Sequence, residues 1–152
     1  MKPVNLHDIN DFLKQEAFVL FGISTNKQKF GNAIYKELIE KGMKIYAIHK
    51  EIEMQENQKC YKTLDELPQK VTAAIICTKP EKTAVILNQL KEYGITQIWL
   101  QQGSATDEVI EKAKQIFSKT ISKKCILMYA NEKGIHKFHA NILRFFRKYP
   151  KK

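Results

Sequence analysis

Residues 17–32 read AFVLFGISTNKQKFGN, an apolar run followed by a polar loop between two glycines. A short continuous apolar run that ends at a glycine is typical of a strand buried on both faces, as in a parallel sheet. After Gly31, apolar residues recur at helical spacing until Gly42, where a glycine stop ends the helix. Residues 44–48 form the next apolar run, which completes a β-α-β unit of about thirty residues.

The alternation of strand and helix continues along the chain. We expect a leading helix at 5–15, a short strand at 60–61, a capped helical turn at 63–68, strands at 71–77, 97–100 and 125–129, helices at 80–93 and 105–119, and a basic C-terminal helix at 136–149. This order predicts an α/β fold, a Rossmann-like, doubly wound and mostly parallel sheet of five to six strands flanked by helices. We interpret residues 1–152 as a single domain, because this length supports one core.

The composition limits the classes of partner and the compartment. Twenty-six Lys and Arg against 16 Asp and Glu give a formal net charge of +10, which favours polyanions: nucleic acid, anionic lipid or a ligand with several phosphates. The 3 cysteines are odd in number and lack a Cys-x-x-Cys spacing, so we expect reduced thiols. Because neither a long apolar run nor a signal-peptide layout is present, we expect a cytoplasmic protein without a membrane span.

The loop after the first strand has the residue types of a phosphate-binding cradle. Gly22 allows a sharp strand exit, and we expect Gly31-Asn32 to let backbone N–H groups at the helix start face an anion. The candidate ligand residues are Gly22, Ile23, Ser24, Thr25, Lys27, Lys29, Phe30, Gly31 and Asn32. A dinucleotide fingerprint requires glycine at positions 24 and 27, and a Walker loop requires it at 27, so both motifs fail. The alternative interpretation is a flexible polar connection with solvated lysines.

Two later loops add candidates. An NAD enzyme usually carries an acidic residue after its second strand, whereas this chain has His49-Lys50, which suits a phosphorylated ribose such as that of NADP or coenzyme A. In Gln101-Gln102-Gly103-Ser104, Gln102 and Gly103 are candidates for ligand contact. The alternative, to which we give equal weight, is that the amides only brace the loop.

Trp99 is expected in the core. His136 and His139 share a helix face, but two ligands without a third do not make a metal site.

Several segments together resemble the small CoA-binding domain family. The first group is Phe18-Val19-Leu20-Phe21-Gly22-Ile23-Ser24, Lys29-Phe30-Gly31-Asn32 and Leu38-Ile39-Glu40-Lys41-Gly42. The second group is Tyr61-Lys62-Thr63-Leu64-Asp65-Glu66-Leu67-Pro68, Thr78-Lys79-Pro80-Glu81 and Ile98-Trp99-Leu100-Gln101-Gln102-Gly103. The resemblance covers about residues 15–130. It departs from the family at His49-Lys50, where an Asn-Pro pair is common, and at Thr72-Ala73, where an Asp is usual.

The resemblance implies a fold similar to the CoA-binding domain of succinyl-CoA synthetase. It implies that the pyrophosphate of coenzyme A or an acyl-CoA lies at residues 22–32, and that Thr78, Lys79 and Pro80 lie on the adenosine side. On this basis Gly31→Asp is expected to abolish binding by placing a carboxylate at the phosphate site, while the fold remains cooperative.

The preferred hypothesis is a CoA-binding sensor, carrier or regulatory module. The sequence shows no Ser/His/Asp, paired-carboxylate or metal constellation, so we predict neither catalytic residues nor metal ligands. The alternatives are an NADP-dependent reductase or a subunit of a CoA ligase or transferase, and then a basic nucleic-acid-binding protein, which we do not expect. A protein partner or a homodimer stays open.

Overall fold

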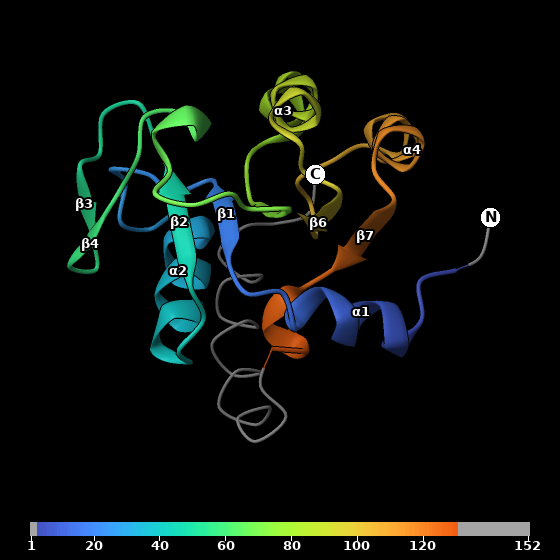
Figure 1. Ribbon diagram of the computed structural model, residues 1–152, viewed down its shortest axis with the longest axis horizontal. Helices are drawn as coiled ribbons and strands as arrows, with labels where there is room; N and C mark the ends of the chain where they lie inside the picture. The colour runs from blue at the N-terminus through green and yellow to red at the C-terminus, as the bar shows by residue number, and fades with distance from the viewer. Residues whose placement is uncertain (1–2, 131–152) are drawn as a thin grey trace.

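The computed structural model describes residues 3–130, and these form a parallel sheet with helices on both faces (Figure 1). Across the sheet the 5 strands lie in the order β2 (Ile45–Ile48), β1 (Phe18–Phe21), β5 (Ala73–Ile76), β6 (Gln97–Gln101) and β7 (Lys119–Lys124). Every neighbouring pair in this sheet is parallel. The doubly wound Rossmann-like fold is therefore confirmed. The expected helix at 136–149, with His136 and His139, lies outside the described residues.

The helices lie in two layers because alternate strand residues face opposite sides of the sheet. In Figure 1, α3 (Pro80–Tyr93) and α4 (Asp107–Ile116) lie above the strands, and α1 (Leu6–Leu13) and α2 (Phe30–Glu40) lie below them. One core joins α1 and α2 to the Trp99 side of the sheet, and the other joins α3 and α4 to the opposite side. Trp99 is fully buried, which confirms its expected place in the core.

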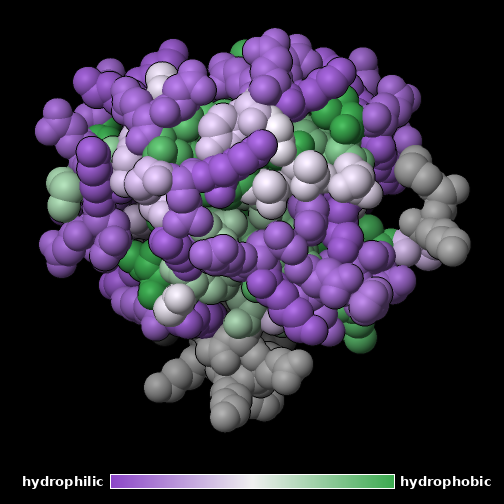
Figure 2. Space-filling model, viewed as in Figure 1, coloured by the Kyte–Doolittle hydropathy of each residue, from purple (hydrophilic) through white to green (hydrophobic). Residues whose placement is uncertain are grey.

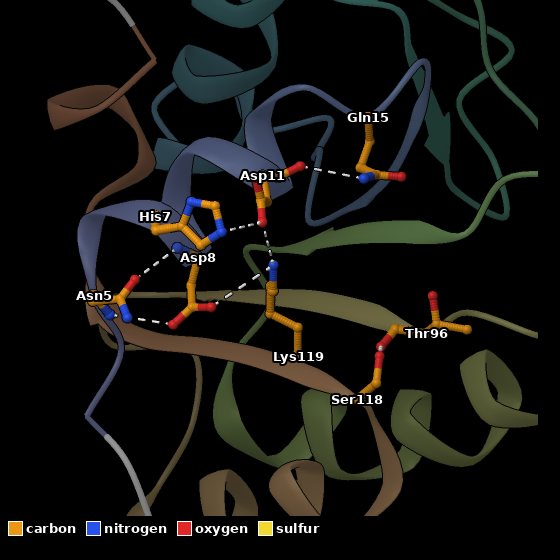
Figure 3. Close-up of polar contacts among 8 residues, drawn as sticks. All are labelled: Asn5, His7, Asp8, Asp11, Gln15, Thr96, Ser118 and Lys119. Atoms are coloured by element: carbon orange, nitrogen blue, oxygen red, sulfur yellow. Dashed lines mark hydrogen bonds and ion pairs between the residues drawn. The ribbon is translucent and has the colours of Figure 1, made fainter.

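Helix α1 is fixed at its start and tied to β7 (Figure 3). The Asn5 side chain accepts from the backbone N–H of Asp8 at 2.9 Å and the Asp8 carboxylate accepts from the N–H of Asn5, which is a capping box. The Lys119 ammonium at the start of β7 lies 3.9 Å from Asp8 and 3.6 Å from Asp11. Partly exposed pairs of this kind contribute roughly 0.2–1 kcal/mol each. They hold the helix against the edge of the sheet.

Several expected elements have correct positions with shorter bounds, and two are wrong. Residues 125–129 are not the last strand: β7 ends at Lys124, and the apolar run continues as the 3-10 turn η2 (Ile126–Met128) packed beneath the sheet. Residues 60–61 are not a strand either, because Tyr61 makes only a single bridge to Ile48.

The segment before Tyr61 folds into a hairpin that we did not anticipate. The hairpin pairs β3 (Met54–Gln55) with β4 (Gln58–Lys59) in antiparallel fashion. Both of its turn residues, Glu56 and Asn57, have positive φ, as a two-residue hairpin turn requires. The helical turn η1 (Leu64–Glu66) forms as expected, but the Thr63 side chain makes no capping hydrogen bond.

The chain reverses its direction of travel across the sheet after β2. Strand β1 is followed by α2 and β2 on one side, and the chain then crosses back to β5 on the other side of β1. Ligands of doubly wound folds bind outside the carboxyl ends of the strands at such a switch point. In the part of the chain that the structure describes, no helix has the length and apolar character to cross a membrane. Hydrophilic residues cover most of the face seen in Figure 2.

Candidate functional site

A cleft of about 660 Å³ lies at the carboxyl ends of β1, β2, β5 and β6, at the switch point. We call it the main cleft. Its lining residues are Gly22, Ile23, Ser24, Lys29, Phe30, Gly31, His49, Cys77, Thr78, Lys79, Pro80, Lys82, Gln101, Gln102, Gly103 and Ser104. The fold thus brings together four loops that were candidates on sequence grounds, those after β1, β2, β5 and β6. The predicted ligand roles of these residues stay predictions.

Four of the predicted residues lie outside the main cleft. Thr25, Lys27 and Asn32 line a hairpin-side cavity of about 690 Å³ between the first loop and the β3–β4 hairpin. Lys50 lines an α3-side cavity of about 610 Å³ between η1 and α3. His49 and Lys50 therefore face different cavities, although they are consecutive in the chain.

The floor of the main cleft is a close contact between the exit of β1 and the start of α2. The N–H of Cys77 donates to the carbonyl of Phe21 at 2.7 Å, which joins the ends of β5 and β1. Gly22 has φ +127°, and a Cβ there would lie 2.6 Å from the Cβ of Cys77. A Cβ on Gly31 would lie within 2.0 Å of the Gly22 carbonyl oxygen. Both glycines are required for packing.

This contact corrects the expectation for Gly31→Asp. Any side chain at position 31 meets the backbone of Gly22 before it reaches a ligand. We therefore expect the substitution to disrupt the fold, and it cannot serve as a selective test of the phosphate site.

Asn32 holds the first loop in shape from the start of α2. Its side-chain oxygen accepts from the N–H of Ser24 at 2.8 Å, and its amide nitrogen donates to the carbonyls of Ser24 at 2.8 Å and Asn26 at 3.2 Å. Its backbone N–H donates to the Lys29 carbonyl and so does not face an anion, contrary to the expectation from sequence. The residue is buried, with 8% of its surface exposed. Asn32 is thus a structural brace for the loop.

Asn32→Asp is expected to destabilise the protein by about 2 kcal/mol, because the change replaces a buried donor of two hydrogen bonds by an oxygen that faces two carbonyls. Urea unfolding followed by circular dichroism measures the effect. Asn88→Asp on the exposed surface of α3 is the control for the same chemical change. Equal stability of the two variants would contradict the bracing role.

The loop after β5 is fixed by a threonine that sequence reasoning missed. Thr83 is fully buried, and its hydroxyl lies 2.8 Å from that of Thr78 and donates to the Lys79 carbonyl at 3.2 Å. Pro80 is the first residue of α3, where a missing N–H costs nothing. The loop therefore presents Lys79 to the cleft from a fixed backbone.

The loop after β6 combines a brace with cleft-lining residues. The side-chain oxygen of Gln101 accepts from the N–H of Ile126 at 3.0 Å, so this buried residue joins β6 to the segment after β7. The N–H of Ser104 donates to the Gln101 carbonyl at 2.9 Å around Gly103, whose φ is +87°. Gln102 and Gly103 are exposed at the tip of this turn.

The main cleft is electropositive. Lys29 enters it from the start of α2, and Lys79 and Lys82 enter it from the start of α3. None of the described residues that line it is Asp or Glu. Lys29 also stands at the N-cap of α2 and makes no side-chain capping bond, so the positive end of the helix dipole is directed to the same region. Lys82 and Cys77 were absent from the predicted set because neither belongs to a loop motif.

Cys77 has a half-buried side chain in this wall, and burial raises the pKa of its thiol. Burial also raises the pKa of the Cys60 and Cys125 thiols from 9.0, and that of Tyr35 to about 12. Each such group contributes stability that is fully present below its unfolded-state pKa and is lost as the pH rises through its folded-state pKa.

The free energy of unfolding is therefore expected to decline as the pH rises above about 9. Urea unfolding between pH 7.5 and 10.5 measures this slope. Cys77→Ala removes one of the thiols whose pKa is raised by burial. The free energy of unfolding of this variant should therefore decline less steeply with pH than that of the wild type. Parallel curves for the two proteins would refute the contribution of Cys77.

Comparisons with known proteins agree with this geometry. The family model for the CoA binding domain matches residues 16–131. A conserved hypothetical protein from Pyrococcus furiosus is similar in structure, with a TM-score of 0.68 and 26% identity over 74% of this chain and 97% of that chain. A hypothetical protein from Pyrococcus horikoshii OT3 has a TM-score of 0.69 and 21% identity over 94% of this chain and 99% of that chain.

A third similar structure is part of a much longer chain. It is an acetyl-coenzyme A synthetase from Ca. Korarchaeum cryptofilum, with a TM-score of 0.65 and 19% identity over 78% of this chain and 28% of that chain. At this identity the likeness concerns the fold alone. The family match is broader, since it covers well over half of the sequence and every loop of the main cleft. On that match the chain belongs to the CoA-binding domain family.

Proposed function

We propose that the chain binds coenzyme A in the main cleft and acts as a sensor, carrier or regulatory module without chemistry of its own. The observation that carries the proposal is the set of three lysines, Lys29, Lys79 and Lys82, in a cleft whose described lining contains no carboxylate. Coenzyme A carries a pyrophosphate and a 3′-phosphate, so it needs several cations and tolerates no facing acid.

The elements that form the cleft support a placement of the ligand within it. The pyrophosphate lies over the Gly22–Gly31 contact, where the start of α2 and Lys29 supply positive potential. The adenosine side lies between His49 and the loop of Thr78, Lys79 and Pro80. Lys27 and Lys50 line other cavities and act at most as distant charges.

Isothermal titration of the purified protein with CoA, acetyl-CoA, NADPH and NADH tests the proposal. Mass spectrometry of the denatured preparation checks first for nucleotide that co-purifies. We expect CoA to bind in preference to both dinucleotides. Preferential binding of NADPH would replace the proposal by an oxidoreductase function. If none of the four ligands binds, the proposal is refuted.

A further inference from the structure

Gln101 joins the main cleft to the segment that follows β7. It is the last residue of β6, it is only 3% exposed, and it lines the cleft. Its side-chain oxygen Oε1 accepts from the backbone N–H of Ile126 at 3.0 Å. Its nitrogen Nε2 is buried without a hydrogen-bond acceptor among the described residues, and its neighbour is the thiol of Cys125, a weak acceptor. One half of this amide is thus satisfied and the other half is not.

The segment that Gln101 holds leaves the sheet through a strained turn. Lys123 has φ +59°, in the left-handed region that favours glycine. The carbonyl of Lys124 accepts from the indole Nε1 of Trp99 and from the backbone N–H of Gln102, each at 3.2 Å. The chain then turns beneath the sheet as η2, which begins at Ile126. The hydrogen bonds that hold this junction therefore come from the end of β6, beside the main cleft.

Rotation of the Gln101 side chain into the open cleft gives a second arrangement. Water then satisfies both polar atoms of the amide, but the N–H of Ile126 loses its acceptor. In the observed arrangement the N–H of Ile126 is paired and Nε2 of Gln101 is not. Each arrangement leaves one buried donor unpaired, and an unpaired buried donor is the main cost of a lost hydrogen bond. The two arrangements are therefore nearly balanced, so a ligand can shift the population between them.

We infer that Gln101 is a positioning residue that couples occupancy of the main cleft to η2; this inference rests on the proposed function. A ligand in the cleft takes the space that the rotated side chain needs, so it favours the arrangement in which Gln101 holds Ile126. The effect requires no hydrogen bond between the ligand and Gln101. Because linkage is reciprocal, the bond to Ile126 in turn tightens ligand binding by the same factor.

Ile126→Pro tests the coupling from the side away from the ligand, because it removes the N–H that Gln101 accepts and Ile126 is not among the residues that line the cleft. Cys125 has φ −88° and ψ 121°, which suits a residue before proline. Ile126→Val is the matched control, since it also loses packing but keeps the N–H. By isothermal titration we expect CoA to bind about tenfold more weakly to the proline variant than to the valine variant. Equal affinities would overturn the inference.

Hydrogen exchange in the wild type gives a second test that does not depend on how the variant folds. We expect CoA to slow exchange at the amide of Ile126 about tenfold more than at the amide of Phe117, which donates to the Ala113 carbonyl on the opposite face of the sheet. Equal slowing at the two amides would overturn the inference. If the wild type does not bind CoA, the proposed function fails, whereas CoA binding without these differences removes this inference alone.

Discussion

Gly31→Ala is expected to lower the free energy of unfolding by about 3 kcal/mol or more, the upper end of the cost of overpacking. The added Cβ would lie 2.0 Å from the carbonyl oxygen of Gly22, 2.8 Å from its carbonyl carbon and 3.4 Å from the Cβ of Cys77. The first two atoms belong to the backbone, so no side chain can rotate away to make room. Helix α2 would have to move off β1. Urea unfolding measures the loss.

Gly103→Ala is the matched control for this substitution. Gly103 has no atom within 4 Å of an added Cβ, but its φ is +87°. The cost there is conformational strain alone, about 1–2 kcal/mol. A ranking in which Gly103→Ala is the more damaging variant would show that the contact between Gly22 and Gly31 can relax.

The double variant Lys29→Gln with Lys79→Gln is expected to weaken CoA binding by about a hundredfold, since hydrogen bonds to charged groups contribute about 1.5–3 kcal/mol each. The two lysines enter the main cleft from different helices and so act on different parts of the ligand. Isothermal titration at low ionic strength gives the affinities. Added salt should reduce the difference from the wild type, because it screens the charges.

The control is Lys27→Gln with Lys50→Gln, which removes the same net charge from residues that line the other two cavities. We expect less than about a threefold loss, consistent with the small effect of exposed and screened charges. If both double variants lose affinity equally, the protein attracts the ligand by its net charge and the main cleft does not select it.

The sequence predicted the inner strands and α3 well, because burial and conformation coincide there. The run before Gly22 is apolar on every residue and belongs to a strand covered on both faces. Helix α3 begins at Pro80 and ends at Tyr93, directly before Gly94 with its φ of +107°, as Pro80 and Gly94 predict. Residues 125–129 are equally apolar, but they are buried as a turn beneath the sheet. Apolar character reports burial and does not by itself distinguish a strand from a turn.

The sequence predicted which loops form the candidate site. It did not predict how the side chains are arranged within that site. Parallel strands place their carboxyl ends at one edge, so the loops after β1, β2, β5 and β6 had to be neighbours. The direction of each side chain depends on local contacts that spacing does not encode. The Asn32 side chain forms hydrogen bonds with the loop itself, and Lys50 lines a different cavity from His49.

The order of the strands also governs how the chain folds. β1 pairs with β2 and with β5, and the second pairing joins Phe18 to Ala73 across more than a third of the sequence. Contacts between residues so far apart must overcome a large loop-closure entropy before they stabilise anything. The β1–α2–β2 unit can form early from local contacts, whereas one edge of β1 stays unpaired until β5 arrives. The protein should therefore fold more slowly than a helical bundle of its length, and its main cleft, which needs both edges of β1, should be among the last features to form.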